Sequence, residues 1–397
     1  MRRRGKAGMM TPQDSPFLFR RPLARRLVLR DFRSYAALDC RFGARLVALC
    51  GENGAGKTNL LEALSLFSPG RGLRRVDMGD CARHGGAGGF AVSLELETED
   101  AIVQLGHGLD SSGAEGAAAR KFRIDRVPAP SATAFADHLR VLWLTPAMDG
   151  LFMGAAGERR RFLDRLALGV DAEHGARVSR LERALRNRNK LLEEGVSDRR
   201  WLDAAEAEVA ALGVVVAAAR LETVSRLVAL IAAGRDDDSP FPWAEIVLEG
   251  ELETMLLGSS ALDAEDRYRE ALAASRRRDA AAGRTLLGPQ ASDLVVRHGP
   301  KGEAARACST GEQKALLTGL VLAHAKLVAA MSGAAPVLLL DEIAAHFDAR
   351  RRAALFDALE ALGSQVWMTG ADPAAFRELA GRAEIFNVTP GRIEPAG

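Results

Sequence analysis

One eight-residue segment, Gly51 to Thr58, limits what this chain can fold into more than any other. It reads GENGAGKT and matches the phosphate-binding pattern G-x-x-x-x-G-K-[ST] in full. The apolar run 45–50 precedes it and the amphipathic run 59–66 follows it, so we expect the segment to join a buried strand to a helix. A glycine-rich turn that matched by chance would not need this context.

In such a loop, glycines let backbone N–H groups turn toward phosphate oxygens, and the positive end of the following helix points at the same phosphates. Lys57 is expected to reach the β- and γ-phosphates, and Thr58 to offer its hydroxyl to Mg²⁺. We therefore predict that ATP and Mg²⁺ bind here. The predicted nucleotide-binding residues of the loop are Gly51, Glu52, Asn53, Gly54, Ala55, Gly56, Lys57 and Thr58.

A second apolar run, 336–340, ends in two acids, Asp341 and Glu342. Carboxylates at the end of a buried strand need a partner, because an unpaired buried charge is costly. A phosphate-bound metal ion supplies one, so we predict that Asp341, acting through a water, holds Mg²⁺ together with Thr58. Glu342 is the predicted catalytic residue, acting as general base toward an attacking water.

A third motif, CSTGEQK at 308–314, precedes a helix expected over 315–328. A capping box from Ser309 or Thr310 to Gln313 explains the hydroxyl but leaves Gly311 unexplained. In order, spacing and content, the segment resembles the signature motif of ABC-type ATPases. That resemblance implies that Ser309 and Gly311 contact the γ-phosphate of a nucleotide held by a partner subunit.

Two downstream segments extend this resemblance. Residues 345–348 lie where that class has its D-loop, and 365–370 lie where its final strand carries a switch residue, here Thr369. The resemblance therefore adds five residues to the predicted nucleotide site: Ser309, Gly311, Gln313, Asp348 and Thr369.

The spacing of the motifs separates the subclasses of these ATPases. Thr58 and Cys308 lie 250 positions apart. Transporter ATPases have far fewer residues there, and chromosome-condensing or break-repair ATPases have a coiled coil of hundreds. Here the residues between about 157 and 235 follow helical patterns without sustained heptads. The intermediate length is similar to that of the RecF family of bacterial recombination mediators.

Further stretches resemble that family over about residues 26–390. They are LVLRDFRSY at 27–35, the loop and its helix at 51–63, TPAMD at 145–149, GERRRFLDR at 157–165 and GRTLLGP at 283–289. The chain departs from the family pattern at Ala147, at 290–293, at Glu312 and at 346–347.

The resemblance implies an α/β fold, an ABC-type P-loop ATPase head with an inserted helical lobe. The expected divisions are a basic, disordered tail over 1–25, the first part of the ATPase lobe over 26–150, a helical lobe over 151–283 and the second part of the ATPase lobe over 284–397.

The function implied is that of an ATP-dependent DNA-binding protein of recombinational repair and replication restart at single-strand gaps. It would act as an ATP-driven dimer clamp with slow, DNA-stimulated hydrolysis, and its implied partners are DNA, a second copy of itself, and RecR and RecO type mediators. The alternatives are a transporter ATPase subunit and a chromosome-structural head, and the intact Lys57, Asp341 and Glu342 disfavour the latter.

Composition is compatible with this function and excludes others. A net charge of +2 is too mild to indicate nucleic-acid binding on its own. The four cysteines are far apart and form no C-x-x-C pair, which favours a reducing cytoplasm and argues against a zinc ribbon. We see no apolar run near the ~18 residues that a membrane span needs, so no membrane partner is expected.

The basic and aromatic residues leave alternatives open. The arginine runs 159–161 and 276–278 could contact DNA phosphates, or could be solvated helix faces paired with Glu158, Asp164 and Asp279. His324 and His346 have no partner at metal-ligand spacing. The four tryptophans are expected to pack inside the protein.

Overall fold

The computed structural model describes residues 19–111, 119–195, 198–343 and 347–396. Residues 1–18 of the expected tail lie outside this part. The first strand, β1, begins at Leu23, so the last residues of that expected tail belong to a sheet.

The central sheet positions the predicted site. Its order is β15-β14-β3-β13-β12-β8, and all neighbours are parallel except β15. The three inner strands are short and fully buried, as is usual for strands inside a parallel sheet. Their bounds are Leu46–Cys50 for β3, Val366–Gly370 for β13 and Val337–Leu340 for β12, and the outer strands are Val141–Leu144 (β8), Glu384–Thr389 (β14) and Arg392–Pro395 (β15).

A second, antiparallel sheet lies beside it in the order β2-β1-β4-β5-β6-β7. Helix α1, Lys57–Ser65, is buried on nearly every side, and His107 on β5 bonds the carbonyl of Leu66 at its end with an Nδ1–O distance of 3.0 Å. The strands are Leu23–Phe32 (β1), Tyr35–Arg41 (β2), Phe90–Glu97 (β4), Ile102–Asp110 (β5), Ala119–Ile124 (β6) and Val127–Ala129 (β7).

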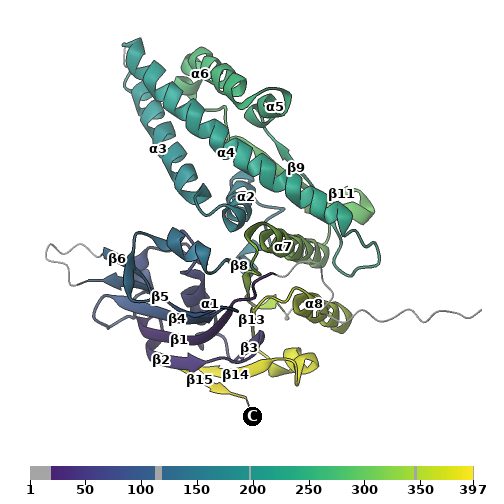
Figure 1. The fold of residues 1–397 in the computed structure, drawn as a ribbon. Helices are drawn as coiled ribbons and strands as arrows, with labels where there is room; N and C mark the ends of the chain where they lie inside the picture. Colours follow the sequence, from purple (N-terminus) through teal and green to yellow (C-terminus); the bar gives the residue numbers. More distant parts are fainter. Residues whose placement is uncertain (1–18, 112–118, 196–197, 344–346, 397) are drawn as a thin grey trace, which may run out of the picture.

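The long helices α3, α4 and α6 form an arm that projects from the head, with α2 at its base (Figure 1). A small sheet, β11-β10-β9, also lies near that base. The bounds are Ala156–Val170 (α2), His174–Glu193 (α3), Arg199–Ala233 (α4), Glu251–Gly258 (α5), Ala261–Ala282 (α6), Ala244–Glu249 (β9), Asp293–His298 (β10) and Glu303–Ala304 (β11). Helices α7, Thr310–Ser332, and α8, Ala349–Ala361, complete the head.

Short 3-10 helices connect these elements, at Met78–Cys81, Ala132–Asp137, Pro146–Met148, Gly299–Lys301, Ala305–Ala307 and Pro373–Leu379.

Two hydrophobic clusters fill the described part of the chain. The larger joins both head sheets to α2, α7 and the last turns of α4, and the smaller lies within the arm between α3, α4, α5 and α6. Leu163 of α2 and Leu227 of α4 belong to the larger cluster. The expected lobe boundaries at 150 and 283 remain a prediction, because the core of the head continues into the base of the arm.

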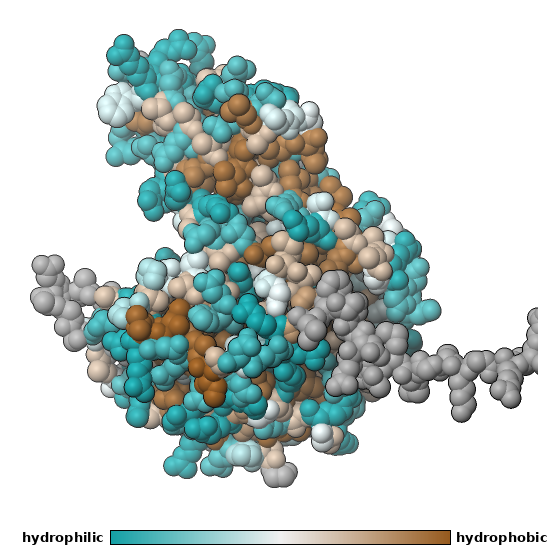
Figure 2. All heavy atoms as spheres, in the orientation of Figure 1, coloured by the Kyte–Doolittle hydropathy of each residue, from teal (hydrophilic) through white to brown (hydrophobic). Residues whose placement is uncertain are grey.

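Helix α7 is long and apolar enough to cross a membrane by length and composition. The sequence had suggested no such run. In the fold, Leu316, Leu320 and Val328 of α7 are buried in the head core, so α7 has the surroundings of a core helix. On the face shown in Figure 2, apolar residues gather along the arm and over the antiparallel sheet.

The expected strands at 45–50 and 336–340 and the expected helices at 59–66 and 315–328 are present as β3, β12, α1 and α7, with small shifts of their ends. The short elements β8, α5, β14 and β15 were not anticipated. Trp143 and Trp367 are buried as expected, but Trp201 is 65% exposed at the start of α4, so its expected packing is wrong.

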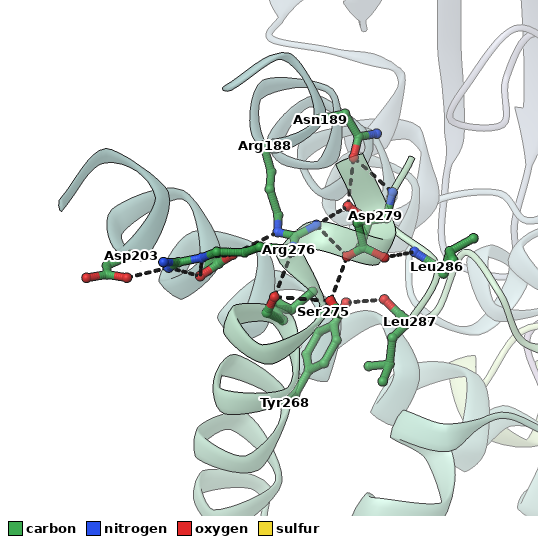
Figure 3. Close-up of polar contacts among 12 residues, drawn as sticks. Arg188, Asn189, Asp203, Tyr268, Ser275, Arg276, Asp279, Leu286 and Leu287 are labelled. Atoms are coloured by element: carbon green, nitrogen blue, oxygen red, sulfur yellow. Dashed lines mark hydrogen bonds and ion pairs between the residues drawn. The ribbon is translucent and has the colours of Figure 1, made fainter. Parts of the chain in front are cut away.

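A buried polar network holds the arm together (Figure 3). Arg188 on α3 is fully buried and donates to Glu206 on α4 and to Asp279 on α6, with N–O distances of 3.2 and 2.9 Å. It also donates to the hydroxyl of Thr285 at 2.7 Å. One guanidinium therefore joins three helices to the GRTLLGP stretch.

Replacing Arg188 with Met should lower the free energy of unfolding by about 3–5 kcal/mol, because Asp279 would keep a buried charge without its guanidinium partner, while Glu206 would retain only Arg276. Urea unfolding followed by circular dichroism measures this. Arg186→Met, at an exposed position of the same helix, is the control and should stay within about 0.5 kcal/mol of the wild type. Equal stability of both variants would contradict a structural role for the network.

Candidate functional site

The phosphate-binding loop follows β3 and is supported from behind by Tyr35 of the FRSY stretch. Gly56 has φ +110°, and a Cβ there would lie 2.8 Å from the Tyr35 oxygen. The Tyr35 hydroxyl donates to the Gly56 carbonyl at 3.2 Å, and burial raises the pKa of this phenol, so it remains a donor. A side chain at position 56 would therefore clash as well as strain the backbone.

Lys57 lies folded over the loop. Its ammonium donates to the carbonyls of Gly51 and Glu52, with distances of 2.6 and 3.0 Å, and lies 4.0 Å from Oε1 of Glu342. The side chain is 4% exposed. The ammonium thus also serves the loop itself, in addition to the phosphate contact expected for it.

The acidic strand end meets the loop. The Thr58 hydroxyl donates to both carboxylate oxygens of Asp341, at 3.0 and 3.1 Å. A hydroxyl and a carboxylate this close are hard oxygen donors of the kind that Mg²⁺ prefers, so the predicted pair Thr58 and Asp341 fits that ion. Among the residues described, no group of three or more His, Cys, Asp or Glu side chains is placed to hold a metal ion.

Glu342 and Thr369 complete this edge of the sheet. Thr369, at the end of β13, donates its hydroxyl to Asp341 at 2.7 Å and accepts the backbone N–H of Glu342 at 2.8 Å. Glu342 has φ +54°, a conformation that non-glycine residues rarely adopt. Such strain is found at functional sites when neighbouring bonds hold it.

A cavity of about 290 Å³ opens between these groups. Asp341 and Thr369 lie behind it, and its lining residues are Asn53, Gly54, Gly56, Lys57, Thr58, Asn59, Arg74 and Glu342. The loop and the proposed base therefore share one cavity.

Arg74 is a lining residue that the sequence analysis missed. Its guanidinium donates to Asn59 at 2.8 Å and to Glu62 on α1 at 2.7 Å, and Arg33 also donates to Glu62. The turn after α1 brings Arg74 back to the loop, and no periodic pattern announces that turn. The signal available in the sequence was a basic residue shortly after the helix that follows the phosphate-binding loop.

The signature segment forms the start of α7. Ser309 is its N-cap, and the capping box closes with Glu312, not with the expected Gln313, because the third helical residue carries the partner in such a box. Lys301 donates to Glu312 at 2.5 Å, and this bond with those from Ser309 lowers the pKa of Glu312 to about 2. Gln313 turns inward and donates to the carbonyl of Cys308 at 2.8 Å.

Gly311 faces open space within its own chain. A Cβ there would meet a single neighbour within 4 Å among the described atoms, Nη1 of Arg351 at 3.9 Å. Packing inside the chain therefore does not explain the glycine. The surface around it is accessible to a group from outside.

Asp348 caps α8 and accepts the N–H of Arg351 at 2.8 Å. It lines a different cavity, of about 400 Å³, together with Glu312. Ser309, Gly311 and Asp348 are thus absent from the lining of the loop cavity. Ala345 and His346, the start of the expected D-loop, lie outside the described residues.

The arginine runs are largely engaged in structure. Arg159 donates to both oxygens of Asp293, at 2.8 and 2.7 Å, Arg160 donates to the carbonyl of Ser292, and Arg161 is more exposed near Glu158. These contacts tie α2 to β10. Arg276 bonds Asp203 and Glu206 rather than the acids expected for it.

The two stretches most specific to the resemblance meet at the base of the arm. Asp164 of ERRRFLD accepts from Arg220 on α4 at 2.8 Å and lies 2.9 Å from His174 Nε2. Arg220 also donates to the carbonyl of Pro289 in GRTLLGP at 2.6 Å. Burial opposes ionisation of Asp164, but the bonds from His174 and Arg220 outweigh it and lower the pKa of this carboxyl.

Comparison with known proteins supports the sequence-based resemblance. A family model described as RecF/RecN/SMC N terminal domain matches residues 23–393. The chain is 53% identical over 370 residues to a protein named DNA replication and repair protein RecF of Mesorhizobium japonicum, which covers 93% of this chain and 97% of that protein. It is 54% identical over 368 residues to the protein of the same name from Allorhizobium ampelinum, with the same coverage.

Solved structures show the same fold. One titled as the recombination mediator protein RecF-ATPrS in the RecFOR pathway has a TM-score of 0.83 at 19% identity and covers 96% of this chain and 100% of its own. An Smc head domain from Pyrococcus furiosus has a TM-score of 0.51 at 17% identity, covering 94% and 96%. The expected α/β, ABC-type ATPase head is confirmed.

Lys57→Met should weaken ATP binding by about 10- to 150-fold, the effect of losing a hydrogen bond to a charged group. Titration with a fluorescent ATP analogue measures the affinity, and circular dichroism verifies the fold. Lys326→Met, at an exposed position of α7, serves as the control and should bind ATP like the wild type. If a folded Lys57→Met protein binds ATP with unchanged affinity, the loop is not part of the nucleotide site.

Proposed function

Because this chain belongs to the RecF family, whose relatives are named DNA replication and repair proteins, we propose that it is an ATP-dependent DNA-binding protein of recombinational repair that closes on DNA as a dimer. The observation that carries this proposal is the meeting of the loop 51–58 with Glu342 around one cavity, while Asp341 stands directly behind it. ATP binding and slow hydrolysis would then drive a cycle of binding and release.

Each polar group around the cavity has a distinct part in the proposed chemistry. The backbone N–H groups of the loop and the Lys57 ammonium bind the phosphates. Bound Mg²⁺, held by Thr58 and Asp341, would neutralise phosphate charge. Glu342 orients a water and accepts its proton as the water attacks the γ-phosphate.

The signature segment requires a second subunit in this proposal. Ser309 and Gly311 are absent from the lining of their own chain's cavity, and the surface at Gly311 is open. Head-to-tail pairing about a two-fold axis would place both residues, with Asp348, against the γ-phosphate held by the other copy. ATP then becomes part of the dimer interface.

The alternatives are less well supported. A transporter ATPase subunit does not account for the long arm or for relatives that match over 93% of the chain. The Smc head is more distant than RecF in fold, with TM-scores of 0.51 and 0.83. The function as a DNA replication and repair protein of the RecF type is therefore favoured over both.

The partners proposed are DNA at single-strand gaps and mediators of the RecR and RecO type, acting in the cytoplasm. One related structure is described as part of the RecFOR pathway, which supports the mediators. Arg159 and Arg160 are engaged with β10 and the neighbouring backbone, so they are weak candidates for DNA phosphates, whereas Arg161, Arg277 and Arg278 remain exposed.

Glu342→Gln should retain ATP and slow its hydrolysis by about 10²–10⁴-fold, because the amide cannot accept the proton while the phosphate contacts remain. A single-turnover assay with labelled ATP gives the rate, and filter binding gives the retained nucleotide. Wild-type hydrolysis by this variant would mean that another group is the base.

Ser309→Arg should bind ATP through its own loop and yet remain monomeric, because a bulky side chain would occupy the position of the γ-phosphate held by the other copy. Analytical ultracentrifugation with ATP, with and without gapped DNA, measures the state of association. The substitution also removes a helix cap worth about 1 kcal/mol. Ser260→Arg, which removes the cap of α6 in the arm, is therefore the matched control and should dimerise.

If the wild type with ATP stays monomeric at every concentration and with DNA present, the clamp is excluded and only a nucleotide-binding domain remains.

A further inference from the structure

Thr369 is the residue whose surroundings differ most from the role that the signature resemblance implied. A switch residue that contacts the γ-phosphate must present a free polar group to the nucleotide. Thr369 is fully buried and is absent from the lining of the loop cavity. Its side chain faces the two acids at the end of β12.

The hydroxyl of Thr369 both donates and accepts a hydrogen bond. Its proton goes to Oδ1 of Asp341 at 2.7 Å, and its oxygen accepts the N–H of Glu342 at 2.8 Å. A hydroxyl has one proton to donate, so Thr369 cannot also donate to a phosphate oxygen while it holds Asp341. The register of the sheet sets this arrangement, because Met368 on β13 pairs with Leu340, the last residue of β12.

The bond to the Glu342 N–H fixes a strained backbone. Glu342 has φ +54°, and this conformation turns its side chain to within 4.0 Å of the Lys57 ammonium. A non-glycine residue in this region is held there by its surroundings at a cost. Without the Thr369 hydroxyl, the N–H would lose the described acceptor that keeps the carboxylate on the cavity.

The bond to Asp341 has a similar effect on the predicted metal ligand. In this structure both Thr58 and Thr369 donate to Asp341. If the Thr58 oxygen held a metal ion through a lone pair, its proton could still go to Asp341, so Thr58 and Thr369 would orient this carboxylate from two sides. One hydroxyl therefore fixes the positions of both the predicted metal ligand, Asp341, and the proposed base, Glu342.

We propose that Thr369 is a positioning residue for ATP hydrolysis, which acts by holding Asp341 and Glu342 and makes no contact with the nucleotide. The proposal rests on the proposed function, in which the loop 51–58 binds ATP and Glu342 is the base. In this proposal Thr369 does not sense the γ-phosphate, but holds the two acids in place from behind the cavity. It also predicts that a hydroxyl at position 369 matters more than the size of the side chain.

The test compares Thr369→Ser, which keeps the hydroxyl, with Thr369→Val, which keeps the shape and loses it. Thr369→Val should slow single-turnover hydrolysis at saturating ATP and Mg²⁺ by about 10- to 150-fold, as for lost hydrogen bonds to charged groups. Its affinity for ATP in EDTA should stay within about threefold of the wild type, while the gain in affinity on adding Mg²⁺ should shrink. Thr369→Ser should restore both quantities to within about threefold.

Thr223→Val is the matched control, because Thr223 is a buried threonine of α4 whose hydroxyl donates to the carbonyl of Ala219 in the same helix. It should leave both the rate and the effect of Mg²⁺ unchanged. If Thr369→Val does not fold, as judged by its melting temperature, Thr369→Ala against Thr369→Ser makes the same comparison.

The outcomes separate the two proposals. A wild type that hydrolyses ATP no faster than Glu342→Gln removes the proposed function. A wild type that hydrolyses ATP, with Thr369→Val equally fast and equally responsive to Mg²⁺, overturns the role of Thr369 alone. A loss of ATP affinity in EDTA as large as the loss of rate would assign Thr369 to direct nucleotide contact and also overturns the inference.

Discussion

The parallel alignment of β3, β13 and β12 is the constraint on which the site depends. Their carboxyl ends meet at one edge of the sheet, so the loop after β3, Thr369 on β13 and the two acids after β12 come together although Thr58 and Thr369 lie 311 positions apart. The polar groups then satisfy one another through short bonds of 2.6–3.1 Å. Without that alignment each would be a buried polar group in need of a partner.

The same sheet leaves the signature residues apart from the loop. Ser309, Gly311 and Asp348 surround the starts of α7 and α8, and their local bonds complete helix caps without reaching the loop cavity. In the proposed dimer, one subunit would therefore contribute two half-sites on different surfaces. A symmetric pair of subunits can join them, which is how nucleotide binding would be linked to dimer formation in the proposed cycle.

The arm is joined to its base and held together by polar contacts in which nearly every partner is buried. Asp164, Arg220 and Pro289 connect the ERRRFLD and GRTLLGP stretches at the base, and Arg188 continues the connection into the arm. Breaking one partner of such a network is costly because the other keeps its charge. Helix α4 of the arm is therefore coupled to helix α2 and to the GRTLLGP stretch at its base by directional contacts, in addition to apolar packing.

The sequence alone determined the parts whose chemistry is local. GENGAGKT, the apolar strand before Asp341 and Glu342, and the helix after Ser309 follow from composition and spacing over a few residues, and with the family resemblance they predicted the fold class. Only the tertiary structure decided how groups on different elements pair: Arg74 beside the loop, Arg159 on Asp293, and Thr369 behind the acids. The physical reason is that sheet register and chain turns set which side chains of different elements meet, and no short-range periodicity records that choice.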